Sequence, residues 1–103
     1  MMKEIVPETI CAMLEKFGED SQIDVAIEEM SELTKELIKY KRSKIHFREK
    51  QATSRASVVE EMSDVFFMLE YLKRIFDVTD EEIEDAVAAK ATRTKGRYIN
   101  ETE

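Results

Sequence analysis

The chain has 103 residues, of which 23 are acidic and 16 basic, so its formal net charge is −7. This length suits a single domain over residues 1–103 with one core. The negative charge argues against DNA or RNA as a partner, because a phosphate backbone would be repelled. We find no apolar core of a signal peptide and no apolar run of about 18 residues, so we expect a cytoplasmic protein without a membrane span. The single cysteine, Cys11, cannot form an internal disulfide and is expected in the core.

Apolar residues recur every three or four positions along most of the chain, and only two glycines and one proline interrupt them. This pattern predicts an all-α fold with a four-helix bundle-like protomer. The first helix is expected at residues 7–17, because Pro7 suits a first helical turn and Gly18 suits a C-terminal cap. The second helix is expected at about residues 21–42, with Ser21 as its N-cap.

Two more helices complete the pattern. The third is expected at about residues 54–76. The fourth opens at a capping box formed by Thr79 and Glu82 and ends near Arg93. Residues 43–53 then form the only long loop of the domain.

Carboxylates recur at spacings of three and four residues on the second and third expected helices. They are Glu28, Glu29, Glu32 and Glu36 on the second helix, and Glu60, Glu61 and Asp64 on the third. Like charges at these spacings destabilise a helix by about 0.2–0.5 kcal/mol per pair. At about 100° per residue, Glu61 falls between the apolar positions Met68 and Leu72. Glu29 and Glu32 border the apolar stripe of their own helix.

The charge on these carboxylates needs a counter-charge, because an unpaired carboxylate beside a core is costly. Lys35 and Lys39 are within reach but lie toward solvent. A divalent cation is the better remedy, since oxygen ligands at i,i+3 on two facing helices suit Mg²⁺ or Mn²⁺. A di-iron site fits poorly, because it requires Glu-x-x-His and the only histidine, His46, has no glutamate three residues before it. Taken singly, three of the acids are better explained as solvated side chains: Glu28, Glu36 and Glu60.

The two acidic motifs, together with their surroundings, resemble a known family. Glu28-Glu29-x-x-Glu32 followed by Glu61-x-x-Asp64 resembles the signature of the all-α nucleoside triphosphate pyrophosphohydrolases, the MazG-like group. The flanking segments FGEDSQIDVAIEEMSEL and VVEEMSDVFFMLEYL resemble the family's second and third helices. The resemblance extends over roughly residues 10–98.

The resemblance implies a Mg²⁺-dependent hydrolase that converts a canonical or non-canonical NTP or dNTP to the monophosphate and pyrophosphate. It implies Glu29, Glu32, Glu61 and Asp64 as metal ligands, with Mn²⁺ as an alternative ion. Glu28 and Glu29 would be the catalytic carboxylates, because a carboxylate beside the attacking water can accept its proton. Phosphoribosyl-ATP pyrophosphohydrolase is the alternative within the enzyme class. A non-catalytic regulatory or interaction module that keeps the metal site is the alternative outside it.

Two groups of basic residues are candidates for phosphate binding. Lys90 and Arg93 resemble the basic end of the family's last helix and are assigned to the substrate phosphates, although the helix dipole alone also favours cations there. The tail at residues 94–103 is expected to be ordered only if something docks on it. The second group is best explained as a solvated loop, or alternatively as a lid over the triphosphate. Its members are Lys44, Arg48, Lys50 and Arg55.

The third expected helix carries more apolar residues than one small protomer can cover. Its apolar positions extend nearly all the way round the helix: Val58, Val59, Met62, Val65, Phe66, Phe67, Met68, Leu69, Leu72, Ile75 and Phe76. A helix that is apolar on every side is usually buried on every side. We therefore expect a homodimer or homotetramer. The family resemblance further implies a substrate pocket completed by the neighbouring chain.

Overall fold

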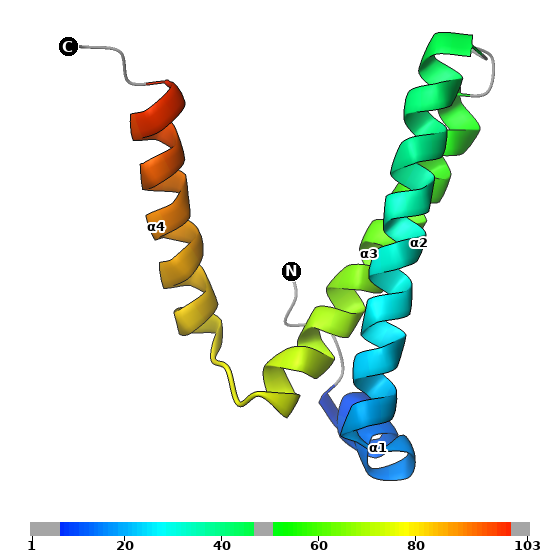
Figure 1. Cartoon of the computed structure of the whole chain (residues 1–103). Coiled ribbons are helices and arrows are strands. Elements are labelled where there is room, and N and C mark those ends of the chain that lie inside the picture. The colour runs from blue at the N-terminus through cyan, green and yellow to red at the C-terminus, as the bar shows by residue number, and fades with distance from the viewer. Residues whose placement is uncertain (1–6, 47–50, 100–103) are drawn as a thin grey trace.

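The computed structural model describes residues 7–46 and 51–99. These residues form helices and turns only, in the order α1 (Pro7–Phe17), α2 (Glu19–His46), α3 (Gln51–Ile75) and α4 (Asp80–Tyr98) (Figure 1). The prediction of an all-α fold is confirmed for this part of the chain. None of the described helices is long and apolar enough to cross a membrane.

The first turn of the fold is set by a glycine. Gly18 has φ +88°, a conformation that side chains with a Cβ rarely adopt, and its N–H donates to the carbonyl of Leu14 at 2.9 Å. The predicted bounds of α1 and its glycine cap are confirmed. The carbonyl of Gly18 also accepts from the N–H of Gln22 at 3.3 Å, so α2 begins at Glu19. The predicted N-cap at Ser21 is therefore wrong, because Gly18 serves both helices.

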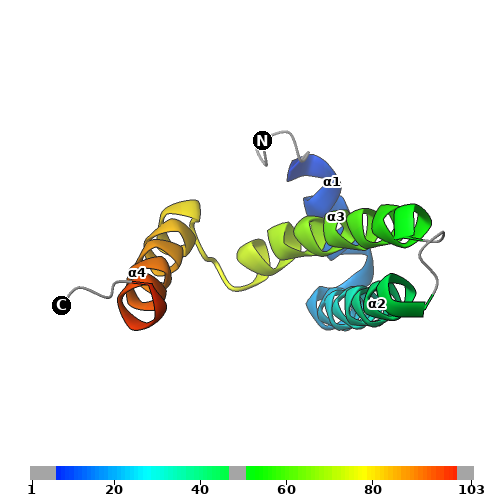
Figure 2. The same cartoon turned by 90° about the horizontal axis from the view of Figure 1, so that it is seen from above.

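The long helices α2 and α3 pack side by side as an antiparallel pair (Figures 1 and 2). The predicted loop at residues 43–53 is wrong over most of its length, since α2 continues to His46 and α3 begins at Gln51. Ser43 is buried, and its hydroxyl donates to the carbonyl of Tyr40 at 2.9 Å inside α2. A helix that packs along a neighbour continues through polar residues that would end it in isolation. Residues 47–50 lie outside the described part.

A defined motif ends α3 and turns the chain. The N–H groups of Asp77 and Val78 donate to the carbonyls of Arg74 and Lys73 at 3.3 and 2.8 Å, and Asp77 has φ +54°. This is a Schellman cap with aspartate in the left-handed position that glycine usually takes. The Nζ of Lys73 contacts the carboxylates of Glu70, at 2.9 Å, and of Asp80 at the start of α4. The turn between α3 and α4 is therefore held by backbone and side-chain contacts.

The predicted capping box opens α4. The hydroxyl oxygen of Thr79 accepts from the N–H of Glu82 at 3.1 Å, and the Glu82 carboxylate accepts from the N–H of Thr79 at 2.8 Å. The predicted end near Arg93 is wrong, because α4 continues to Tyr98. Part of the tail that was predicted to need a docking partner is thus helical, and residues 100–103 lie outside the described part.

The core is small and lies where α1 meets the α2–α3 pair. Its buried members are Ile10, Ala26, Met68 and Tyr71, with Met13, Leu14, Val25 and Leu72 packed against them. No Cα of the described part of α4 comes within 8 Å of another helix, and Figure 2 shows α4 standing apart from the other three. The radius of gyration is 17.4 Å, against about 13 Å for a compact domain of this length. Cys11, predicted to be a core residue, is exposed on α1.

Candidate metal centre

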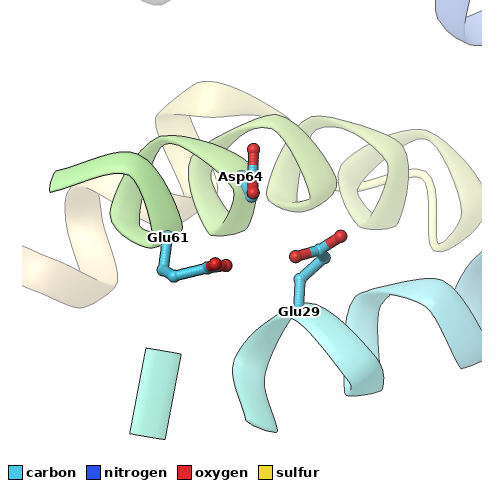
Figure 3. A group of neighbouring side chains, drawn as sticks. All are labelled: Glu29, Glu61 and Asp64. Carbon is cyan, nitrogen blue, oxygen red and sulfur yellow. The ribbon is translucent and has the colours of Figure 1, made fainter. Parts of the chain in front are cut away.

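Three carboxylates from two helices converge near the middle of the α2–α3 pair. One oxygen of Glu29 on α2 and one each of Glu61 and Asp64 on α3 all lie within 4.8 Å of one another. Figure 3 shows Glu29 and Glu61 reaching toward each other across the space between the helices, with Asp64 one turn further along α3. We call these three residues the carboxylate trio.

Local helix geometry explains why these residues meet. Glu61 and Asp64 are three residues apart, so they lie on one face of α3. The same face carries Met68, which is 4% exposed and belongs to the core. The packing that buries Met68 against α2 therefore also brings the two acids against α2, where Glu29 lies opposite.

Glu61 is the most constrained member of the trio. The residue is half-buried, but its Oε1 is withdrawn from water and has no hydrogen-bond partner among the described residues. A buried polar atom without a partner is costly and rare in folded proteins. A bound cation would satisfy this atom.

The electrostatics of the trio favour binding of a positive charge. Desolvation raises the pKa of Glu61, and the charges of Asp64 and Glu29 raise it further. Desolvation also raises the pKa of Glu29, with Asp64 the next cause, while its contact with Glu61 acts in the opposite direction. No described lysine or arginine forms an ion pair with any of the three. The charge of Asp64 therefore adds to the cost of ionising Glu29 and Glu61.

The other acids of the motif lie around the trio and not in it. Glu32 is partly exposed and lies 3.9 Å from the Nζ of Lys35, although its charge contributes to the raised pKa values of Glu29 and Glu61. Glu28 is exposed next to Glu29 on α2. The structure thus brings together three of the four residues expected as ligands and leaves Glu32 at the edge. Glu36 pairs with Lys39 at 3.3 Å and is not part of the cluster.

The basic residues expected at the phosphates are not near the trio within one chain. Lys90 and Arg93 are exposed on α4, which stands apart from the α2–α3 pair (Figure 1). Lys44 and Arg55 are exposed on α2 and α3 rather than in a loop, and Arg48 and Lys50 lie outside the described residues, as does the side chain of His46.

Sequence reasoning missed the polar bridge of Lys73 with Glu70 and Asp80. The spacing of Glu70 and Lys73 indicates half of it, but nothing in the sequence shows that Asp80, on the next helix, comes within reach.

Three oxygen ligands without histidine or thiolate suit Mg²⁺ or Mn²⁺ and fit a soft metal or a histidine-rich di-iron centre poorly. The trio is thus a group of carboxylates that could hold a hard divalent cation. Comparisons of the chain with protein-family models, with curated proteins and with solved structures give no match.

Proposed function

We propose that this chain is a Mg²⁺-dependent nucleotide pyrophosphohydrolase that converts an NTP or dNTP, canonical or non-canonical, to the monophosphate and pyrophosphate. The observation that carries the proposal is the partnerless, water-excluded Oε1 of Glu61, whose carboxylate belongs to the trio with Glu29 and Asp64. The resemblance of the two acidic motifs to the MazG-like family supplies the reaction class.

Glu29, Glu61 and Asp64 would hold the ion, and Glu32, at the edge of the trio, is the nearest further carboxylate of the motif. When bound, Mg²⁺ or Mn²⁺ would offset the negative charge of the triphosphate and lower the pKa of a bound water. Without a cation, the three acids repel one another. A cation bound together with the triphosphate would remove this repulsion.

Glu28 is assigned as the base beside the attacking water. In this reaction the water oxygen bonds to the α-phosphorus, the bond between that phosphorus and the bridging oxygen to the β-phosphate breaks, and pyrophosphate leaves with that oxygen. The proton of the water passes to a carboxylate, which is Glu28 or its neighbour Glu29. Glu28 suits this role because it is exposed and adjacent to the trio without belonging to it.

The test is release of pyrophosphate from a panel of canonical and modified NTPs and dNTPs in Mg²⁺. Wild type is compared with Glu61→Gln and with Glu60→Gln, which removes the same charge from an exposed neighbour on the same helix. We expect release by wild type and Glu60→Gln, and a loss of at least a hundredfold in Glu61→Gln. Metal binding without release from any nucleotide would contradict the hydrolase and favour a regulatory module.

A further inference from the structure

An apolar groove of about 620 Å³ opens between the end of α3 and the start of α4. Its apolar wall includes Phe66 and Leu69 of α3, Phe76 of the turn that follows, and Ile83 of α4. Phe76 and Ile83 are 63% and 45% exposed, so the groove faces water. Figure 1 shows the two helices joined at the turn and diverging from it, so the groove is the inner end of a wedge between them.

The α3 wall of the groove belongs to a longer apolar stripe on the outer side of that helix. The stripe consists of Val59, Met62, Phe66 and Leu69, each at least 38% exposed. At about 100° per residue, it is centred about 120° round α3 from Glu61. The side of α3 that carries the trio is thus packed on α2, whereas the stripe borders the groove.

Helix α4 carries a matching stripe. None of its 19 residues is buried. Its apolar residues Ile83, Val87, Ala91 and Tyr98 fall within about 80° of one another, and Val87 and Tyr98 are 61% and 73% exposed. Helices in proteins draw most of their stability from packing such a face. Both α3 and α4 therefore present an exposed apolar stripe beside the same groove.

The turn provides a pivot between two fixed helix ends. The Schellman cap holds the backbone up to Val78 on α3, and the capping box holds Thr79 on α4. The direction of α4 is therefore set by the backbone torsions between Val78 and Thr79, and hinges absorb motion in such short links. Lys73 bridges to Asp80 beside this pivot. A rotation there moves Asp80 little and moves Tyr98, about 27 Å further along α4, the most.

The two helices are in register for closing the wedge. In a helical hairpin Ile75 and Asp80 lie at one height, so each step back along α3 matches one step forward along α4. Met62 then comes level with Arg93. The two apolar stripes therefore overlap over about four helical turns.

The charges of the two helices complement one another in this register. The first half of α4 is acidic and comes level with Lys73 and Arg74 of α3. The second half of α4 is basic and comes level with Glu60, Glu61 and Asp64. The charged residues of α4 are Asp80, Glu81, Glu82, Glu84 and Asp85, then Lys90, Arg93, Lys95 and Arg97. Opposite charges at matching heights favour α4 of the same chain as the cover of the α3 stripe.

Helix geometry also decides which side of α4 meets the trio when the wedge closes. Lys90 lies about 60° from the centre of the α4 stripe, and Glu84 lies about 60° from it on the other side. When two right-handed helices pack antiparallel on these stripes, Lys90 falls on the side of α3 that carries Glu61. Lys90 is then level with Val65, one residue from Asp64. Closure thus brings a cation to three carboxylates that have no ion-pair partner among the described residues of the open structure.

We propose that α4 is a lid that closes within one chain: it rotates about Val78 and Thr79, packs its apolar stripe on that of α3, and carries Lys90 to the carboxylate trio. The structure holds the open position, and closure removes both stripes from water. The use of Lys90 at a substrate phosphate rests on the proposed function, whereas the closure does not. A chain that hydrolyses no nucleotide therefore still closes, and a measurement of the distance between α3 and α4 tests the closure alone.

Pairs of cysteines in the full chain test the closure. All variants carry Cys11→Ser, because Cys11 is the single cysteine. The first variant adds Met62→Cys with Thr94→Cys, at two positions that meet when the lid closes. The matched control adds Met62→Cys with Thr92→Cys, which replaces the same residue type at nearly the same height on the opposite side of α4. A disulfide requires Cα atoms within about 7 Å, and in the open structure no described Cα of α4 comes within 8 Å of another helix.

The readout is the rate of disulfide formation in a glutathione redox buffer at micromolar protein concentration, followed by mass spectrometry, with circular dichroism as the control for helix content. We expect the pair at positions 62 and 94 to form a within-chain disulfide at least tenfold faster than the control pair. Val87→Asp should slow this reaction at least fivefold, because it places a charge between the stripes. Ala89→Asp, on the far side of α4, should leave the rate unchanged.

Three results would overturn the proposal. The first is an equal rate in the two cysteine pairs. The second is a rate that Val87→Asp leaves unchanged. The third is formation of disulfides between chains in place of within-chain ones, which would assign the stripes to a second copy of the chain.

Discussion

Truncating Met68 tests the core that holds α2 and α3 together below the carboxylate trio. Met68 is 4% exposed and packs in the cluster of Ile10, Ala26 and Tyr71. Met68→Ala removes a buried side chain and leaves a cavity, which costs about 3 kcal/mol. At about 4–8 °C per kcal/mol for a domain of this size, the melting temperature should fall by about 12–24 °C.

Met62→Ala is the matched control, because it changes the same residue type on the same helix at a position that is 44% exposed. In a monomer with α4 open, Met62→Ala should lower the free energy of unfolding by no more than about 0.5 kcal/mol. In a homo-oligomer that covers this side of α3, the cost of Met62→Ala should rise with protein concentration, whereas that of Met68→Ala should not. Urea unfolding followed by circular dichroism at two concentrations measures both. If Met68→Ala costs no more than Met62→Ala in dilute protein, the core does not lie where the structure places it.

Three further predictions concern the charges and the turns. In metal-free buffer, the free energy of unfolding should fall as the pH rises above 4.5, the ordinary pKa of a glutamate. The pKa values of Glu29 and Glu61 are raised in the folded chain, so above this pH the folded chain keeps protons that the unfolded chain has released. The free energy of unfolding of Glu61→Gln should depend less steeply on pH across that range than that of wild type. An unchanged dependence would contradict the raised pKa of Glu61. Lys73→Met should cost about 0.5–1 kcal/mol and speed hydrogen exchange at the start of α4, because the bridge to Asp80 is lost. Gly18→Ala should cost about 1 kcal/mol through backbone strain alone, since an added Cβ meets no atom within 4 Å; thermal melting should show this loss, and a neutral result would contradict the positive φ.

Local chemistry predicted the helix boundaries that depend on one or two residues. Pro7 and Gly18 bound α1 as expected, and Thr79 caps α4, because each motif satisfies the backbone groups of its own helix end. The boundary at residues 43–53 was missed, since the partner helix, and not the local sequence, decides how far α2 and α3 extend.

The same contrast holds for the candidate site. Helical azimuth placed Glu61 among apolar neighbours, and the structure shows its Oε1 excluded from water. Azimuth does not fix side-chain conformation, so it could not show that Glu29, Glu61 and Asp64 would meet while Glu32 lies beside Lys35.

The position of α4 could not be predicted from the sequence. A capping box determines where a helix starts, but not which surface it packs on. None of the residues of α4 is buried against the described part of this chain, so the local sequence does not determine which surface the helix packs on.

Titration of the full chain with Mn²⁺, followed by electron paramagnetic resonance, tests the central claim most directly, because it measures cation binding at the trio apart from any turnover. Wild type and Glu60→Gln should bind the ion with the same affinity, and Mg²⁺ should compete for it. Glu61→Gln should lose the site while its circular dichroism stays that of wild type. If Mn²⁺ binds Glu61→Gln as tightly as wild type, or binds neither, the carboxylate trio is not a metal centre.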